Sequence, residues 1–582
     1  MKKALQYFYK YLKPYWKGIS LVIILTLAMT YFQVVAPVYM GNTVTDLTNI
    51  LKGHGSMTTF YHDLWLMIVF YGLNVLTMGL SWTITSVFNA HANNNMRKNL
   101  FTKLQKMTIK YFDTHQDGKL LSLFTSDIDN IFNAMNNAVF EIIAQSALFI
   151  GTIVMMLLIN VKLALITMAS TPLVVIISIV IMKKASFYLD RQQEEIGALN
   201  GYINEQINGQ KVIITNGLQK DSVQGFTVQN DKVRKTMFKG QFYSGLLYPL
   251  MTGLSLLNLA IVISAGALLI MTGSMSTAKG LGLLVMFVQY SQQYFQPLMQ
   301  LTSIYSMMQL GLTGAKRLKE VEDQPEEDRV PNGQILTAVK KGVSLNDVHF
   351  SYNEKKEILH GVSLDVKAGK YVALVGPTGS GKTTVMNLLN RFYDVNQGSV
   401  TFDGIDVRQL TLTSLRQNVG IVLQDSVLFT GTIAENIKYG KPNATDEEMI
   451  DAAKQAQIHD FIMTLPDQYE TLIGADNEIF STGQKQLLSI ARTILTNPAF
   501  LILDEATSNV DTVTEEKIQK AMDNVIMGRT SFVIAHRLKT ILNADRIVVL
   551  KDGQVLEEGS HQALLAQKGF YYDLYTSQMA FE

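Results

Sequence analysis

Six long runs of apolar residues in the first half of the chain restrict its fold more than any other feature. A helix needs about 20 residues to cross a hydrocarbon core of about 30 Å, and each run is near or above that length. Six buried helices of a soluble domain would not all be this long, so we predict six transmembrane helices in a lipid bilayer. The runs cover residues 19–41, 64–90, 135–159, 163–182, 243–271 and 280–303.

Lysine and arginine are distributed unevenly between the connections of these runs. Three short connections contain one each, whereas 91–134 contains six and 183–242 contains nine, and five lysines precede the first run. Because positive residues remain on the cytoplasmic side, we expect both termini and the second half of the chain in the cytoplasm. The first run continues past Met40 without a cleavage site of small residues, which favours a retained helix over a signal peptide. The pattern predicts a multi-pass protein of the plasma membrane (the inner membrane of a bacterium).

The two long cytoplasmic connections have amphipathic helical spacing, so the membrane helices are predicted to continue into the cytoplasm. Each extension is interrupted once by turn-prone residues, at 112–119 and at 214–221. A helix that runs out, a short crossing piece and a helix that returns would reach a second domain. A solvated coiled coil with no docking role is the alternative.

The composition changes after about residue 312. A charged stretch with Pro325 and Pro331 suits a linker, and from Val343 onward short β-rich runs alternate with helical patterns, as in an α/β domain with a largely parallel sheet. The net charge of +1 gives no reason to expect a nucleic acid, and the absence of cysteine excludes disulfides and thiolate metal sites. The predicted parts are an α-helical membrane domain, 1–312, a linker, 313–342, and an α/β domain, 343–582.

The stretch "GPTGSGKTT" directly follows the β-rich run "YVALV" and matches a phosphate-binding loop, G-x-x-x-x-G-K-[ST]. The glycines let successive backbone N–H groups surround phosphates, and the following helix N-terminus favours negative charge. Lys382 would reach the β- and γ-phosphates, and Thr383 would offer its hydroxyl to Mg²⁺. We therefore predict a P-loop nucleotide-binding domain with ATP and Mg²⁺ as cofactors. The predicted nucleotide-binding residues here are Gly376, Pro377, Thr378, Gly379, Ser380, Gly381, Lys382, Thr383 and Thr384.

The stretch "FLILDE" at 500–505 is predicted to be a buried strand that ends in two carboxylates. Asp504 would hold Mg²⁺ through water. Glu505 would lie next to the γ-phosphate, where it can orient or deprotonate the attacking water. Two acids at a strand end could form a solvated turn instead, but the phosphate loop favours a hydrolytic site.

Taken together, the ordered motifs resemble the nucleotide-binding domain of an ABC transporter. The motifs are the phosphate loop, "GIVLQD", the stretch 480–484, "LILDEATSNVD" and "VIAHR". The preceding six membrane helices with long extensions resemble the exporter branch of the family, the multidrug or type IV exporters, in which one chain carries one membrane domain and one ATPase domain. The resemblance covers nearly the whole chain and implies an ATP hydrolase coupled to transport by alternating access.

The resemblance also implies roles for four residues outside the two main motifs. Tyr352 in "FSYNE" matches the aromatic residue that stacks on adenine, although a strand-edge tyrosine is the alternative. Gln424 matches the glutamine that links Mg²⁺ and the attacking water to the membrane domain. His536 matches the histidine that contacts the γ-phosphate, and Asp511 matches an aspartate that communicates across the dimer.

The segment that matches the family's LSGGQ signature is altered in this chain. In the family, each ATP lies between the phosphate loop of one chain and the signature of the other. Here the signature is "FSTGQ": Ser481, Gly483 and Gln484 are retained, but Thr482 replaces the first glycine and puts a β-branched side chain where backbone should approach phosphate. Just upstream, Ala475 stands where exporters of this type usually carry glutamate.

These departures predict a heterodimer with one degenerate site. This chain would supply Lys382, Asp504, Glu505 and His536 to one hydrolytic site, completed by an intact signature from a second, homologous half-transporter. The partner is expected to carry LSGGQ and a residue other than glutamate after its Walker B aspartate. A homodimer that tolerates Thr482 is the alternative.

The predicted membrane helices are almost free of charge, with the exception of Glu141, which could contact a cationic substrate or remain solvated near the cytoplasmic end. Aromatic, amide and methionine side chains are plentiful, as in "MFVQYSQQYFQPLMQ" at 286–300. Such surfaces adapt to varied apolar ligands, so we expect efflux of small hydrophobic or amphipathic compounds. A lipid flippase that acts as a homodimer is the alternative, and an ATP-gated channel is a further class.

Overall fold

The computed structural model describes residues 2–272, 276–327, 330, 332–353, 356–423, 426–474, 480–504, 511–535 and 542–579, apart from the side chains at 2, 138, 139, 247, 301–303, 305, 306, 578 and 579. The chain forms two compact units. The first contains Met1–Lys106 and His115–Gln324, and the second contains Met107–Thr114 and Pro325–Glu582. Each unit is described by itself.

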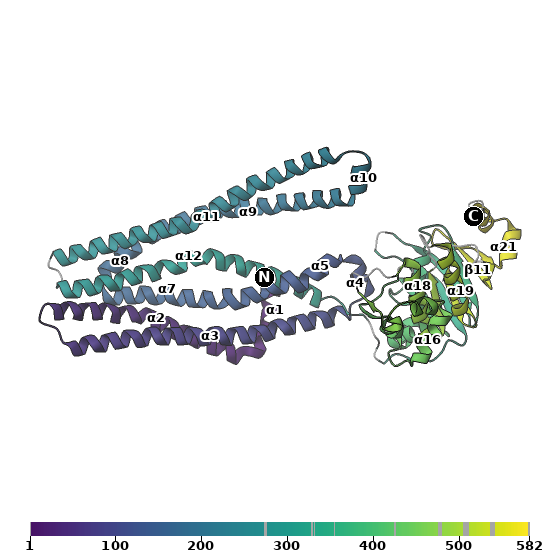
Figure 1. Cartoon of the computed structure of the whole chain (residues 1–582), viewed down its shortest axis with the longest axis horizontal. Coiled ribbons are helices and arrows are strands. Elements are labelled where there is room, and N and C mark those ends of the chain that lie inside the picture. The colour runs from purple at the N-terminus through teal and green to yellow at the C-terminus, as the bar shows by residue number, and fades with distance from the viewer. Residues whose placement is uncertain are drawn as a thin grey trace. The chain divides into compact units, whose positions relative to one another are not determined.

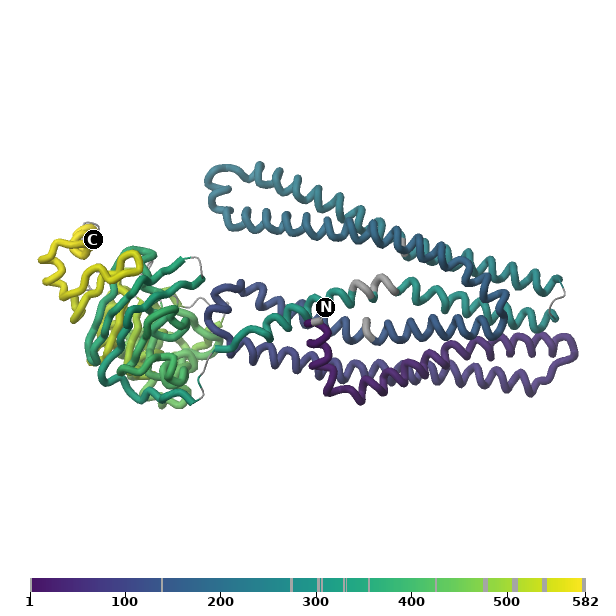
Figure 2. The backbone as a smooth tube through the Cα atoms, turned by 180° about the vertical axis from the view of Figure 1, so that it is seen from behind, coloured from purple at the N-terminus to yellow at the C-terminus, as the bar shows by residue number. Residues whose placement is uncertain are grey.

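The first unit is built from long helices that run along one another (Figure 1). Its N-terminal helix α1 leads through a short 3-10 turn into α2, and short helical pieces precede α7. The paired helices α9 and α11 run side by side to the short helix α10 at their end (Figure 2). The helices are α1 (Lys2–Leu12), α2 (Trp16–Leu51), α3 (Met57–Leu104), α5 (Asp117–Ser122), α6 (Ile128–Asn133), α7 (Val139–Ile159), α8 (Val161–Ala169), α9 (Thr171–Asn208), α10 (Gln210–Thr215), α11 (Gln219–Met271) and α12 (Thr277–Glu322).

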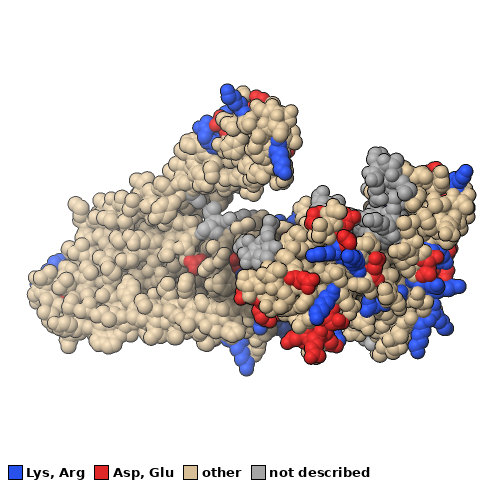
Figure 3. All heavy atoms as spheres, turned by 45° about the vertical axis from the view of Figure 1, so that its right-hand side comes forward, with Lys and Arg blue, Asp and Glu red and all other residues tan. Residues whose placement is uncertain are grey.

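By length and composition, the described residues contain five helical segments able to cross a membrane: Lys3–Leu51, Met57–Leu104, Asp117–Ile159, Val161–Asn208 and Gln219–Met271. The sixth predicted run lies inside α12, a helix of 46 residues, where five glutamines between positions 289 and 300 lower the hydropathy. On the face drawn in Figure 3 the helical unit is almost free of charge until the end of the α9–α11 pair. The 48 residues of α3 extend about 70 Å, so this helix is much longer than the hydrocarbon core.

A proline in α2 shows how two of these helices are fastened together. Pro37 has no N–H, so the carbonyl of Gln33 loses its partner within the helix. The side-chain amide of Gln293 on α12 donates to that carbonyl at 3.2 Å, and the buried hydroxyl of Tyr290 donates to the carbonyl of Val34 at 2.8 Å. The carbonyl of Gln33, which Pro37 leaves without a partner inside α2, is therefore hydrogen-bonded by a side chain of α12, and Tyr290 adds a second hydrogen bond between the two helices.

The two predicted crossing pieces form short helices slightly earlier in the chain than their turn residues suggested. These helices are α4 (Ile109–Thr114), which belongs to the second unit, and α10, which belongs to the first. Gly217, two residues after the end of α10, adopts a positive φ of 68°, whereas Asp117, Gly118 and Lys119 of the other turn-prone stretch form the first turn of α5.

The second unit contains two main sheets. In the six-stranded sheet the order is β12-β11-β3-β10-β9-β6, and all neighbours are parallel except β12. Its strands are β12 (Gln554–Gly559), β11 (Arg546–Lys551), β3 (Tyr371–Val375), β10 (Thr530–Ile534), β9 (Phe500–Asp504) and β6 (Val419–Val422). The four-stranded sheet is antiparallel and consists of β2 (Leu359–Lys367), β1 (Gly342–Phe350), β4 (Gln397–Phe402) and β5 (Ile405–Asp406).

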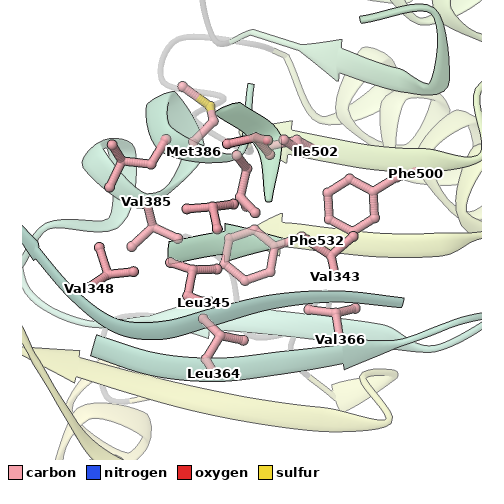
Figure 4. Packing of buried hydrophobic residues seen from close by; sticks show 14 of the residues in the cluster. Val343, Leu345, Val348, Leu364, Val366, Val385, Met386, Phe500, Ile502 and Phe532 are labelled. Carbon is pink, nitrogen blue, oxygen red and sulfur yellow. The ribbon is translucent and has the colours of Figure 1, made fainter. Parts of the chain in front are cut away.

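The core of the second unit lies between these sheets. Apolar side chains of β1 and β2 face Phe500, Ile502 and Phe532 from the parallel strands, with Val385 and Met386 of the helix α13 (Lys382–Leu389) beside them (Figure 4). Strands β3, β9 and β10 are buried at every position, which explains why their sequences do not alternate between apolar and polar residues. This α/β fold and the helical unit agree with the predicted fold class.

Candidate functional site

The predicted phosphate loop lies between β3 and α13, as the strand-loop-helix pattern requires. Gly381 precedes α13 with a φ of 106°, and a Cβ there would lie 2.7 Å from Leu359 Cδ2. A Cβ at Gly376 would collide with the carbonyl oxygen of Leu550. Both positions therefore require glycine, and the loop leaves backbone N–H groups at the N-terminus of α13, where an anion is favoured.

The side chain of Lys382 is buried under this loop. Its Nζ donates to the carbonyl of Gly376 at 2.7 Å and to that of Pro377 at 3.0 Å. Burial lowers the pKa of Lys382, and the negative charge of Asp504 opposes this effect. The neighbouring Ser380 hydroxyl is buried and has no hydrogen-bond partner among the described residues. An ammonium group and an unsatisfied hydroxyl at a helix N-terminus are a donor set that fits the phosphates of ATP.

Asp504 ends β9 and is largely buried, and it pairs in register with Ile534 of β10. The carboxyl ends of β3, β10, β9 and β6 meet at one edge of the parallel sheet, and the phosphate loop follows the first of these strands. Thr383, the other predicted Mg²⁺ ligand here, is exposed in the first turn of α13. A hydroxyl and a carboxylate are oxygen ligands that suit a hard cation that keeps some of its water.

Three predicted catalytic residues lie outside the described part of the chain: Gln424, Glu505 and His536. Their positions in sequence place them directly after the strands of this edge, since β6 ends at Val422, β9 at Asp504 and β10 at Ile534. Their assignment rests on sequence alone and remains a prediction.

Tyr352 is attached to the helix that follows the phosphate loop. Its hydroxyl donates to Thr384 Oγ1 at 3.3 Å and accepts from Asn387 Nδ2 at 3.0 Å. Its ring packs edge-on against Phe350 and Tyr393, each with a centroid distance of 4.9 Å. The structure thus brings the predicted adenine-stacking residue to the phosphate loop, and it identifies Asn387 as a positioning residue that the motifs did not reveal.

We expect Asn387→Ala to weaken ATP binding while leaving the maximal hydrolysis rate nearly unchanged. The variant loses one hydrogen bond that orients Tyr352, worth about 1 kcal/mol or about a fivefold rise in Kd. Titration with a fluorescent ATP analogue and the KM for ATP measure the effect. Tyr352→Phe removes this bond and also the one to Thr384 Oγ1, so the double variant should bind ATP no worse than Tyr352→Phe alone; additive losses would contradict this role of Asn387.

The altered signature begins the helix α18 (Thr482–Thr496). Ser481 is the N-cap: its Oγ accepts from Gln484 N at 3.3 Å, while Gln484 Oε1 accepts from Ser481 N at 2.9 Å. This reciprocal pair is a capping box, so both polar side chains serve the helix end of their own chain. Thr482 follows at the first helical position and is exposed, whereas Gly483 is buried. In the described part of the chain, no hydrogen bond or ion pair joins these residues to the phosphate loop.

Asp511 caps another helix, α19 (Thr512–Ile526). Its Oδ2 accepts from Thr514 N at 2.9 Å, and this hydrogen bond lowers the pKa of the Asp511 carboxyl. The structure therefore gives Asp511 a local role as a helix cap, which is compatible with the predicted exposure to a partner chain.

Arg492 connects α18 to the segment that follows Gln424, and sequence reasoning missed it. Its guanidinium lies over the stacked rings of Phe429 and Tyr439, at 5.7 and 5.3 Å from their centroids. Its Nε donates to Asn436 O at 2.9 Å and its Nη1 to Val427 O at 3.4 Å. An arginine within the largely apolar stretch "LLSIARTIL" of α18 was the available signal.

A second contact that sequence reasoning missed involves the short helix α4. The hydroxyl of Tyr393 donates to Asp113 Oδ2 at 2.5 Å, and burial together with Asp113 raises the pKa of Tyr393. Tyr393 also contacts Tyr352, so one aromatic ring separates the predicted adenine platform from this crossing piece.

Comparison with known proteins matches both halves of the chain to described families. Residues 19–298 match the ABC transporter transmembrane region, and residues 359–508 match the ABC transporter family. An uncharacterized ABC transporter ATP-binding protein of Bacillus subtilis, YfiC, is 39% identical over 97% of this chain and 92% of its own length. A fatty acid ABC transporter ATP-binding/permease protein of Mycobacterium tuberculosis is 37% identical over 92% and 84%, respectively.

Two further similarities concern lipid transport and solved structures. An ATP-dependent lipid A-core flippase of Saccharophagus degradans is 36% identical over 91% of this chain and 86% of its own. The solved structure of a bacterial Atm1-family ABC exporter with ATP bound has a TM-score of 0.76 and 29% identity, and the similarity covers 97% of this chain and 98% of that one.

Proposed function

The chain belongs to the ABC transporter family, with the size of a half-transporter and the fold of an exporter, and on that basis we propose that it drives export of amphipathic, lipid-like molecules as one half of a heterodimer. The single observation that carries the heterodimer is the signature "FSTGQ" beside an otherwise complete set of catalytic residues. We place it in the plasma membrane of a bacterium, with the ATPase domain in the cytoplasm.

The residues at the edge of the parallel sheet have separate tasks in this proposal. Lys382 and the loop N–H groups hold the β- and γ-phosphates, and Tyr352 stacks on adenine. Thr383, Asp504 and Gln424 would hold Mg²⁺, which supplies positive charge to the phosphates when bound. Glu505 orients and deprotonates the attacking water, and His536 contacts the γ-phosphate.

The signature supports two unequal ATP sites because its polar side chains already form hydrogen bonds within their own helix. Ser481 and Gln484 are paired in their capping box, so binding of a partner's phosphate depends on close approach of the backbone at the helix N-terminus. Thr482 adds a β-branched side chain at that point. In a homodimer this obstacle would face both ATP molecules, whereas in a heterodimer it faces only one.

Half-transporters of this family act as dimers, and the end of the α9–α11 pair has a surface that dimer formation would cover. Val212 is 63% exposed, Ile214 54% and Leu218 46%. These apolar side chains belong to the part of the helical unit that we place in the cytoplasm. An exposed apolar tip in water favours burial against another protein surface.

Two observations bear on the substrate. Relatives with assigned transport activities are named for a fatty acid and for lipid A-core, which favours a lipid-like cargo. A cavity in the helical unit is lined in part by Met29, Met78, Met307, Trp82 and Phe140, and this methionine-rich, aromatic lining adapts to varied apolar shapes. Multidrug efflux is therefore the second candidate.

Transport in proteoliposomes tests the proposed function. The complex is purified by a tag on this chain so that its partner subunit copurifies, and is reconstituted with either a fluorescent phospholipid or a fluorescent amphipathic dye. We expect ATP-dependent movement of at least one probe, with none in the Lys382→Ala variant. ATP hydrolysis that persists without movement of either probe would contradict export of this class.

A further inference from the structure

A cavity of about 230 Å³ lies within the helical unit, among α2, α3, α7 and α12, and contains the one acidic side chain of the predicted membrane runs. Its lining includes Glu141, Gln300, Trp82, Phe140, Met29 and Met78. Glu141 is 18 residues from Ile159 at the opposite end of α7, which corresponds to about 27 Å along the helix. The carboxylate therefore lies near one border of a hydrocarbon core of about 30 Å, at the depth of lipid head groups.

Glu141, Gln145 and Gln300 form a polar cluster in which one acceptor oxygen has no donor within the described part of the chain. Gln145 Nε2 donates to Glu141 Oε1 at 2.7 Å and to Gln300 Oε1 at 3.2 Å, so both of its N–H groups are used. Turning the Gln145 amide round would set its oxygen against the carboxylate, which fixes this orientation. Gln145 Oε1 is then buried without a partner among the described residues.

A second polar pair at the cavity, Asn89 and Asn136, also contains an acceptor oxygen without a donor in the part of the chain that the structure describes. Asn89 Nδ2 donates to Oδ1 of Asn136, which lines the cavity, at 2.9 Å. Asn89 is 1% exposed, and its Oδ1 has no hydrogen-bond partner among the described residues. Each of these two polar pairs therefore contains an acceptor that lacks a donor among the described residues, although the hydroxyls of Thr26, Ser81 and Thr85 also line the cavity.

A purely structural role for Glu141 does not account for these contacts. Within the described residues Glu141 forms no ion pair with a lysine, arginine or histidine. The backbone also continues helically before α7 through a π-helical turn (Ala134–Ala138), so Glu141 does not complement a free helix N-terminus. A carboxylate at a membrane border is costly without an ion pair, and a cation that joins it removes that cost.

We propose that this cavity binds the protonated amine head group of an amphipathic molecule, a proposal that rests on the proposed export function. A primary ammonium group brings three N–H donors and one positive charge, which is what the cluster lacks. Trp82 and Phe140 line the cavity, and aromatic rings attract cations; the methionines suit a flexible hydrocarbon chain. An anionic amphiphile would be repelled by Glu141, and a neutral one would leave its charge unpaired.

Fluorescence of Trp82 can report binding directly. The chain has three tryptophans, so Trp16→Phe and Trp65→Phe leave Trp82 as the only one. The full chain in maltoside micelles is titrated with decylammonium chloride, with decanol, and with dioctanoyl phosphatidylethanolamine against dioctanoyl phosphatidylglycerol. These arms separate a single-chain amine from an aminolipid as the source of the head group.

We expect a saturable change with decylammonium that Glu141→Gln weakens at least about tenfold, because a charge-assisted hydrogen bond is lost. Decanol binding should not respond to the variant. Glu194→Gln, an exposed carboxylate on α9, is the matched control and should behave as the parent. Binding of the phosphatidylethanolamine but not the phosphatidylglycerol would extend the site to aminolipids, and binding of decylammonium alone would restrict it to single-chain amines.

Equal binding of decylammonium and decanol, or an unchanged affinity in Glu141→Gln, would overturn the proposal. Either result can be distinguished from failure of the proposed export function by the transport assay. If the reconstituted complex still moves another amphiphile with ATP while Glu141→Gln has no effect on amine binding, the head-group site is wrong and the exporter stands.

Discussion

Replacing Glu505 by glutamine is expected to slow ATP hydrolysis by the assembled transporter about a hundredfold or more, because a positioned general base contributes at least that factor. ATP binding should persist, since glutamine keeps the shape of the side chain and leaves Lys382 and the loop N–H groups in place. Phosphate release and ATP binding are measured on the same preparation. Glu447→Gln, an exposed acid in the first turn of the helix Asp446–Gln455, is the matched control.

An equal rate in Glu505→Gln and the parent would mean that the partner chain, not this one, supplies the base. A parallel loss of ATP binding would mean that the variant disturbs the site instead of the chemistry. Only a fall in turnover with retained binding supports the role proposed for Glu505.

Thr482→Gly is expected to raise the ATPase rate of this chain, purified without a partner, at least about tenfold. Removal of the side chain lets backbone N–H groups approach the γ-phosphate of a second copy, and one donor of this kind contributes about a hundredfold to a thousandfold in rate. Glycine at this position keeps the capping box of Ser481 and Gln484, so α18 should still begin where it does.

Thr482→Ser is the matched control for that gain. It removes only the methyl group and keeps a side chain at the point of close approach, so it should recover little of the activity. If serine and glycine gave the same gain, the branching of threonine, not the presence of a side chain, would be the obstacle. No gain with glycine would mean that Thr482 does not limit this chain.

The sequence predicts well those features of the protein in which a local pattern determines the structure. The loop at Gly376 and Gly381 follows a fully buried strand and begins a helix, and each feature has its own signal in the chain. The same holds for the parallel strands, whose apolar runs have no polar alternation because both faces are covered. The long helices followed from the length of the apolar runs and, for their extensions, from amphipathic spacing.

Other features depend on contacts between distant segments, which no local pattern contains. The anchoring of Tyr352 by Asn387, the contact of Tyr393 with Asp113 and the stacking of Arg492 each join residues from different elements. The pattern S-x-x-Q at the signature is visible in the sequence, but only the structure shows that Ser481 and Gln484 cap the N-terminus of α18. The short helices α4 and α10 begin earlier in the chain than predicted, because turn-prone residues mark helix boundaries.

The most direct test of shared ATP sites is the ATPase rate of this chain purified free of any other ABC subunit, measured beside its own Glu505→Gln variant. Unequal sites predict that the two rates are indistinguishable, because every site in such a preparation faces the Thr482 signature. Robust hydrolysis that disappears with Glu505→Gln would show a competent homodimer and contradict the division of labour.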